Sequence, residues 1–376
     1  MRILYLIGNG FDLHVGLRTG YQSFLEYYLR QPIPEGLDNV GIRYIKRLKE
    51  DIKNNIQLWS ELELQFGKHT SKMGTMGSSI HSLQEEFDII NDDIREKLSA
   101  YIAQEDKRSY FAENARKVFL EDIIEPCSGL RDYEKALVDR HKTNFWGNTT
   151  NDVGIITFNY TRTIEHLLGT MPIQSSGFEI HEPIHVHGYY NQRMILGVND
   201  VSQIENEKLR ENDYVVDAIV KSNCNHTYED AHTNKCKRLI STAQLICCYG
   251  LSFGDTDKTW WKEICDALKN RGDLIVILFS HINNMPNYSN SGHKLQNQMK
   301  QIRDGFLDKG GLGVTTKQGV EKRVLVILND GIFNIQVDDR TPEEKLVGKP
   351  APGTVERLED SFRTIRGNQL SYDKVM

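Results

Sequence analysis

Basic clusters, long apolar runs and dense cysteines are all missing from this sequence of 376 residues. Its formal net charge of −6 is spread along the chain, which argues against binding nucleic acid through a positive patch. No apolar run approaches the roughly 18 residues of a membrane span. The N-terminal residues do not show the pattern of a signal peptide, in which a charged leader is followed by a small-residue cleavage site. We therefore expect a cytoplasmic protein without a membrane partner.

The cysteines are also too few for a disulfide scaffold, since the whole chain has six. We predict reduced thiols, with Cys247 and Cys248 packed on opposite faces of a strand as small hydrophobic groups. One loop offers four ligands for a tetrahedral zinc, namely Cys224, His226, His232 and Cys236. Their spacing is unusual, so we favour a polar loop and predict that no metal is required.

What the sequence does contain is a series of short apolar runs bounded by glycine, asparagine or serine. They lie at residues 3–7, 153–158, 184–186, 245–249, 274–279 and 324–328. Apolar runs without polar alternation are typical of strands covered on both faces, and most of these runs alternate with helical patterns. We predict an α/β fold with a doubly wound, mostly parallel sheet.

A long helical region separates the first two strands. An apolar stripe at helical spacing runs through Leu83, Phe87, Ile90, Ile94, Leu98 and Ile102. We predict a nucleotide-binding core at residues 1–20 and 149–338, a helical insertion at 21–148 and a peripheral tail at 339–376. The insertion leaves the carboxyl end of the first strand, so its helices should roof a ligand cleft.

The first strand ends in a glycine turn, Gly8-Asn9-Gly10. Gly8 and Gly10 supply the first two glycines of a dinucleotide-binding fingerprint, but Leu13 stands where the third belongs. No obvious acidic strand end follows about 20 residues on. The turn is therefore not a standard fingerprint, and a purely structural tight turn is the alternative interpretation.

The other predicted strands also end in small or polar residues, which are Asn159 and Thr161, His187 and Gly188, Gly250 and Ser252, and Ser280. The carboxyl ends of parallel strands converge where open sheets bind ligands, so we predict a nucleotide-sized cleft there.

Each of these polar residues also has an alternative interpretation as a purely structural residue. Asn159 is equally suited to cap the next helix, and capping is favoured for Asp255 and Asp257. His185 and His187 share a strand face, but only His187 lies near the carboxyl end. A lone histidine is more often a packing residue, although one at a strand end can act as a general base.

Several segments together carry a family resemblance. They are residues 7–12 with Gly16, Leu17 and Tyr21, then 59–63, 157–161, 185–188, 195–200 and 249–257. They resemble the AbiH family of bacterial phage abortive-infection proteins. That family is in turn similar to the sirtuin-like NAD-binding fold, a Rossmann variant with a Gly-Ala-Gly turn, a strand-end asparagine and a His-Gly pair. Gly8-Asn9-Gly10, Asn159 and His187-Gly188 occupy those places here.

The resemblance implies an antiphage effector that hydrolyses NAD, or a related nucleotide, between nicotinamide and ribose. Asn159 would orient the water and His187 would accept its proton, while Gly8, Gly10 and Ser252 would cradle the pyrophosphate. Asn9, Asp12, Thr161, Gly188, Gly250 and Ser280 complete the predicted binding site. The activity would be restrained until a phage-derived trigger acts through a change of oligomer or of the insertion, and we expect a homo-oligomer.

The sequence also departs from the sirtuin pattern. Sirtuins place an aspartate where this chain has Thr161, and Asp12 replaces it only if its loop folds inward. The four-cysteine zinc module of protein-deacylating sirtuins is absent, which argues against deacylation. Two alternatives stay open: a sensor that binds ADP-ribose without turnover and acts through a partner, and a metal-dependent nuclease suggested by the histidine and aspartate content.

Overall fold

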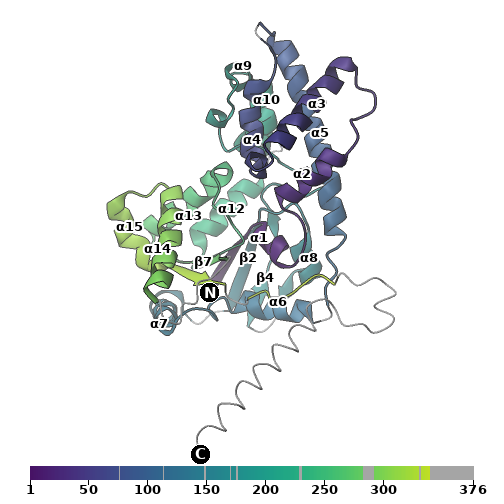
Figure 1. Cartoon of the computed structure of the whole chain (residues 1–376). Helices are drawn as coiled ribbons and strands as arrows, with labels where there is room; N and C mark the ends of the chain where they lie inside the picture. Colours follow the sequence, from purple (N-terminus) through teal and green to yellow (C-terminus); the bar gives the residue numbers. More distant parts are fainter. Residues whose placement is uncertain are drawn as a thin grey trace, which may run out of the picture.

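A computed structural model describes residues 1–75, 77–112, 114–147, 150–169, 171–174, 177–227, 231–282, 292–329 and 332–338. The predicted tail at 339–376 lies outside these residues. The chain has an α/β fold in which helices cover both faces of a mostly parallel sheet (Figure 1). The predicted α/β class with a mostly parallel sheet is thereby confirmed.

All of the predicted apolar runs form strands, and no strand end differs from the prediction by more than two residues. The strands are β1 (Arg2–Ile7), β2 (Asn151–Thr157), β3 (Ile173–Gln174), β4 (Phe178–Ile180), β5 (Ile184–His185), β6 (Leu245–Tyr249), β7 (Ile275–Ser280) and β8 (Val324–Leu328). The prediction missed β3 and β4, which are short and only partly buried. Because β5 ends at His185, His187 lies in the following turn and not on the strand.

The strands follow the order β3-β4-β2-β1-β6-β7-β8, and β5 also pairs with β2. Among the strands of the described ranges, only β3 and β4 pair antiparallel. The chain first builds the sheet on one side of β1 and then crosses to β6 on the other side. The order therefore reverses between β1 and β6, and open parallel sheets bind ligands at the carboxyl end of such a reversal.

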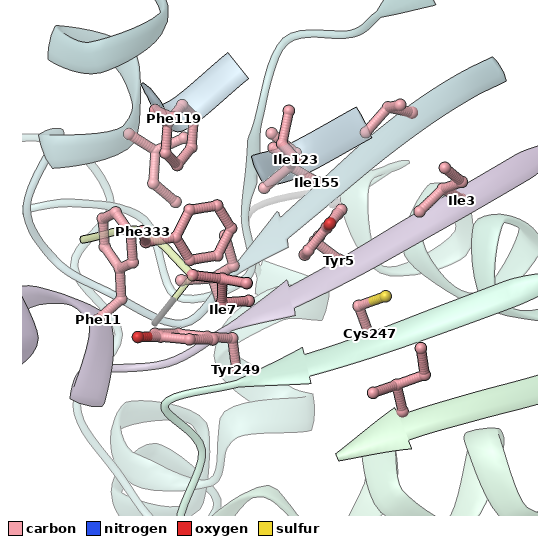
Figure 2. Packing of buried hydrophobic residues seen from close by; sticks show 14 of the residues in the cluster. Ile3, Tyr5, Ile7, Phe11, Phe119, Ile123, Ile155, Cys247, Tyr249 and Phe333 are labelled. Atoms are coloured by element: carbon pink, nitrogen blue, oxygen red, sulfur yellow. The ribbon is translucent and has the colours of Figure 1, made fainter. Parts of the chain in front are cut away.

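Alternate residues of each strand enter two different cores. Tyr5, Ile7 and Cys247 face α6 (Ala115–Ile124), α7 (Asp132–His141) and α8 (Thr163–Leu168). Figure 2 shows Tyr5, Phe11, Phe119, Tyr249 and Phe333 gathered on this face. Cys248 faces α12 (Ala231–Thr242), α13 (Lys258–Asn270), α14 (Gly292–Lys309) and α15 (Val314–Val320). The opposite orientations of Cys247 and Cys248 are confirmed, and all six cysteines are free.

A third core lies in a separate group of helices (Figure 1), which we call the helical lobe. It contains α2 (Tyr21–Arg30), α3 (Asn39–Asn54), α4 (Leu62–His69), α5 (Ile80–Asp106), α9 (Glu207–Arg210) and α10 (Asp213–Ile219), with residues 196–204. The apolar stripe predicted between Leu83 and Ile102 lies buried on α5, as expected. No helix in the described ranges is long and apolar enough to cross a membrane.

Residues 21–148 are thus divided between two cores. Helices α2 to α5 pack in the helical lobe, whereas α6 and α7 pack on the sheet. The core of the helical lobe also contains residues from the later segment 196–220. The helical segment leaving β1 therefore serves both parts of the molecule.

Candidate functional site

The turns after β1 and β6 pack backbone against backbone. The amides of Gly8 and Gly10 donate to the carbonyls of Tyr249 and Gly250, each at 2.9 Å. A Cβ on Gly10 would lie 2.6 Å from the Cα of Gly250, whose own φ is +65°. Only glycine permits this approach. Both amides already donate to carbonyls of the β6 turn, so neither N–H is free for a ligand. The predicted cradling of a pyrophosphate by Gly8 and Gly10 stays a prediction.

Helix α1 (Gly10–His14) folds inward and buries Asp12, which is 1% exposed. Its Oδ2 accepts a hydrogen bond from the Thr161 hydroxyl at 2.6 Å. Its Oδ1 has no hydrogen-bond partner among the described residues. The carboxylate therefore lies beside Thr161. The loop of Asp12 folds inward, which is the condition set above for Asp12 to replace the sirtuin aspartate. Asn9, by contrast, turns toward Thr19, whose hydroxyl donates to Asn9 Oδ1 at 2.5 Å.

Asn159 follows β2 and is 4% exposed. Neither its Oδ1 nor its Nδ2 finds a partner in the described parts of the chain. The N-cap of α8 is Arg162, so the interpretation of Asn159 as a helix cap is wrong. A buried amide without partners costs about 1–3 kcal/mol per unsatisfied group, and it points to a bound ligand or water.

Burial raises the pKa of Asp12 to about 6, although the hydrogen bond from the Thr161 hydroxyl opposes the shift. Because the folded-state value lies above the ordinary 3.8, ionising Asp12 is harder in the folded chain. Ionisation therefore costs stability above about pH 6, and this cost disappears as the pH falls toward 4.

We expect Asp12→Asn to increase the free energy of unfolding by on the order of 2 kcal/mol near pH 8 and to change it little near pH 4. The asparagine keeps an oxygen for Thr161 but carries no charge to bury. Urea unfolding at both pH values measures the difference. Asp139→Asn is the control, because that carboxylate is 70% exposed. An equal gain at both pH values would contradict the prediction.

His187 forms a buried pair with Asp257. Its Nε2 lies 2.8 Å from Asp257 Oδ1, and its Nδ1 is buried with no partner in the ranges that the structure describes. A carboxylate accepts only, so Nε2 carries the proton and Nδ1 of the neutral ring keeps a lone pair. Phe158 packs edge-on against the imidazole, with the two ring centroids 5.7 Å apart. A histidine with one free nitrogen and a carboxylate on the other can act chemically as an oriented general base.

Asp257 lies at the N-cap position of α13, as predicted, but its side chain makes no capping hydrogen bond. Its Oδ1 also accepts from Lys221 Nζ at 2.9 Å. Burial alone would raise the pKa of Asp257, but Lys221 and His187 hold it well below its usual range. Asp255 is the first residue of a short 3₁₀ helix whose N-cap is Gly254, and its carboxylate pairs with Lys309 at 2.6 Å.

Lys221 extends this pair into the helical lobe. Its Nζ lies 2.9 Å from Glu63 Oε2, and Tyr160 contacts the other oxygen of Glu63 at 3.2 Å. Burial lowers the pKa of Lys221, but Asp257 and Glu63 together raise it above its ordinary value. The ammonium is therefore charged. Sequence reasoning gave no role to Glu63 or Lys221, because a lysine buried between two carboxylates leaves no local pattern.

His185 holds the backbone that follows β2 in place. Its Nδ1 donates to the Asn159 carbonyl at 3.0 Å, and its Nε2 lies 2.7 Å from Glu165 Oε1. With both nitrogens engaged, it leaves His187 as the member of this pair with a free nitrogen. The expectation that His187 is the available histidine agrees with this geometry.

The remaining predicted residues lie around the same edge of the sheet. Gly188 has a φ of +67° and packs against the Arg193 backbone, so its position requires glycine. Ser252 is exposed after β6, and Ser280 is the last residue of β7. Their contact with a ligand stays a prediction.

The zinc set predicted as a weak possibility is only partly described. Cys224 and Cys236 are buried on different helices, and the Cys224 thiol donates to the Asp217 carbonyl at 3.3 Å. His232 is exposed, and the side chain of His226 lies outside the described residues. Among the side chains that are described, no group of three or more histidine, cysteine or acidic residues is placed to hold a metal.

The family described as Bacteriophage abortive infection AbiH matches residues 4–279. This span runs from β1 into β7 and contains Asp12, Glu63, Asn159, His187, Lys221 and Asp257. No curated protein matches the chain.

Proposed function

The chain belongs to the AbiH family of bacteriophage abortive-infection proteins, and from that premise we propose that it hydrolyses NAD, or a related nucleotide, at the N-glycosidic bond. One observation carries the proposal. The free Nδ1 of His187 and the free amide of Asn159 are both buried at the carboxyl edge of the sheet. Perturbed or unpartnered buried groups concentrated at one edge are typical of a functional site.

The strand order supports a dinucleotide. Taking β4 and β5 together, the parallel strands in chain order lie as third, second, first, fourth, fifth and sixth across the sheet. Dinucleotide-binding folds have this order and bind their ligand at its reversal. We include in the proposal that the fold is a sirtuin-like Rossmann variant.

In the proposed reaction, the bond between ribose C1′ and the nicotinamide nitrogen breaks, and its electron pair leaves with nicotinamide. The positive charge that develops at C1′ is removed when a water oxygen bonds to that carbon. Asn159 holds the water, and His187 Nδ1 takes its proton. Asp257 stabilises the imidazolium that results, as a carboxylate does in catalytic triads. The products are nicotinamide and ADP-ribose.

Asp12 and Asn159 offer groups that match a carboxamide. The free Oδ1 of Asp12 accepts from an amide N–H, and the free Nδ2 of Asn159 donates to an amide oxygen. Asp12 lies beside Thr161, where sirtuins place their aspartate. We propose that this carboxylate recognises nicotinamide.

The proposal includes a restraint on the enzyme, because constant loss of NAD would harm the host. A phage-derived trigger would release it in the cytoplasm, through a change of oligomer or a movement of the helical lobe. No nucleic acid or metal takes part in the proposed step.

Incubation of the purified protein with NAD, alone and with phage lysate, tests the proposal. We expect equal amounts of nicotinamide and ADP-ribose in at least one condition. No release in either condition, together with measurable binding of ADP-ribose, would overturn hydrolysis and favour the sensor. Nuclease activity that a chelator abolishes would favour the nuclease.

A further inference from the structure

The buried charges beside His187 come from three distant parts of the chain. Glu63 lies on α4, Lys221 opens α11 (Lys221–Thr227), and Asp257 ends the 3₁₀ helix η5 (Asp255–Asp257). The side chains of Glu63 and Lys221 are 8% and 7% exposed. Helix α4 of the helical lobe is thereby connected to the residue that orients His187.

Lys221 and His187 share one acceptor atom. Lys221 Nζ and His187 Nε2 lie 2.9 and 2.8 Å from the same Oδ1 of Asp257. The lysine therefore fixes the oxygen that sets which nitrogen of His187 carries the proton. Without its ammonium, two buried carboxylates would face each other, and they would repel strongly where little water screens them.

Stability alone does not account for this cluster. Replacing a buried ion pair with apolar residues of similar volume is often neutral or stabilising. The cluster also leaves one more carboxylate than ammonium groups when His187 is neutral. One negative charge of this cluster is therefore left without an ammonium partner.

We propose that Lys221 and Glu63 are positioning residues for His187, which hold Asp257 in place and make its position depend on helix α4. This inference rests on the proposed role of His187 as a base. It gives the helical lobe a direct route to the reacting groups, because a shift of α4 moves Glu63, then Lys221 and Asp257. The effect is on the orientation and tautomer of His187, without contact with the substrate.

The test reads the two ring nitrogens of His187 by NMR in the full-length protein labelled with ¹⁵N-histidine, without substrate. The chemical shifts distinguish a protonated from a bare nitrogen, and His187→Ala assigns the signals. We expect the wild type to show one tautomer, with the proton on Nε2. Lys221→Met should lose this single pattern, Glu63→Gln should lose part of it, and Lys221→Arg should keep it.

Kinetics of nicotinamide release provide a second readout. For Lys221→Met we expect kcat to fall by about 10²-fold with little change in KM, as for loss of general-base function. Lys72→Met is the matched control, since it removes a lysine that pairs with Asp51 at 2.5 Å, with its own side chain 49% exposed. It should leave both readouts unchanged.

A folded Lys221→Met protein that keeps the single tautomer of His187 would overturn the inference. If Lys221→Met does not fold, Glu63→Gln decides in the same way, because it keeps the size of the side chain and the pair of Lys221 with Asp257. The NMR readout needs no activity. A wild type that releases no nicotinamide, either alone or with phage lysate, would overturn the proposed function, and the NMR result would still decide the positioning roles.

Discussion

Replacing His187 with alanine lowers the rate of nicotinamide release by about 10³-fold, because the substitution removes the proposed acceptor of the proton from water. Binding of ADP-ribose should persist, since the base acts on water and not on the nucleotide. Steady-state kinetics give the rate, and calorimetric titration with ADP-ribose gives the binding. Loss of rate without loss of binding is the signature of a group that acts in the transition state.

His181→Ala is the matched control for this experiment. His181 pairs with Asp152 at 2.6 Å, but both side chains are about half exposed, at 47% and 49%. The control thus removes a histidine–aspartate pair without touching the site, and the rate should not change. Asn159→Ala should also slow release. If release is undiminished in both His187→Ala and Asn159→Ala, the catalytic assignment is wrong even though the activity is right.

Replacing Gly250 with alanine lowers the free energy of unfolding by on the order of 3 kcal/mol, combining backbone strain with overpacking. The new Cβ would lie 2.5 Å from the Phe11 nitrogen, at a φ of +65°. The two turns at the reversal of strand order would have to separate. Urea unfolding measures the loss.

Gly36→Ala separates the two contributions. Gly36 has a φ of +83°, and a Cβ there meets nothing within 4 Å. We expect it to lose about 1 kcal/mol from backbone strain alone. Equal losses at Gly36 and Gly250 would show that the turns after β1 and β6 are not in close contact.

The sheet was predictable because its strands are covered on both faces. Burial on both faces leaves runs such as residues 245–249 without polar alternation, so the sequence marks them directly. The edge strand β3 has only two residues and an exposed position, so no run identifies it. Which helices cover the sheet was less predictable. Apolar spacing shows that α6 buries one of its faces, but not whether that face packs on the sheet or on other helices.

The candidate site was predictable where strand ends supply it. Asn159 and His187 follow β2 and β5, so topology alone brings them to one edge. Asp257 was expected as a cap, because an aspartate before a helix is usually one. Lys221 and Glu63 are 158 residues apart, and nothing local in either segment indicates that the two will meet.

The pairing of β1 on both sides also sets an order of events during synthesis. Ile3 is synthesised long before its partner on β6, Leu245. Asp257 follows later still, so a nascent chain holds His187 and Glu63 before the groups that join them exist. In the proposed reaction, a chain still on the ribosome therefore lacks the carboxylate that orients His187, which slows its hydrolysis of NAD until synthesis has passed Asp257.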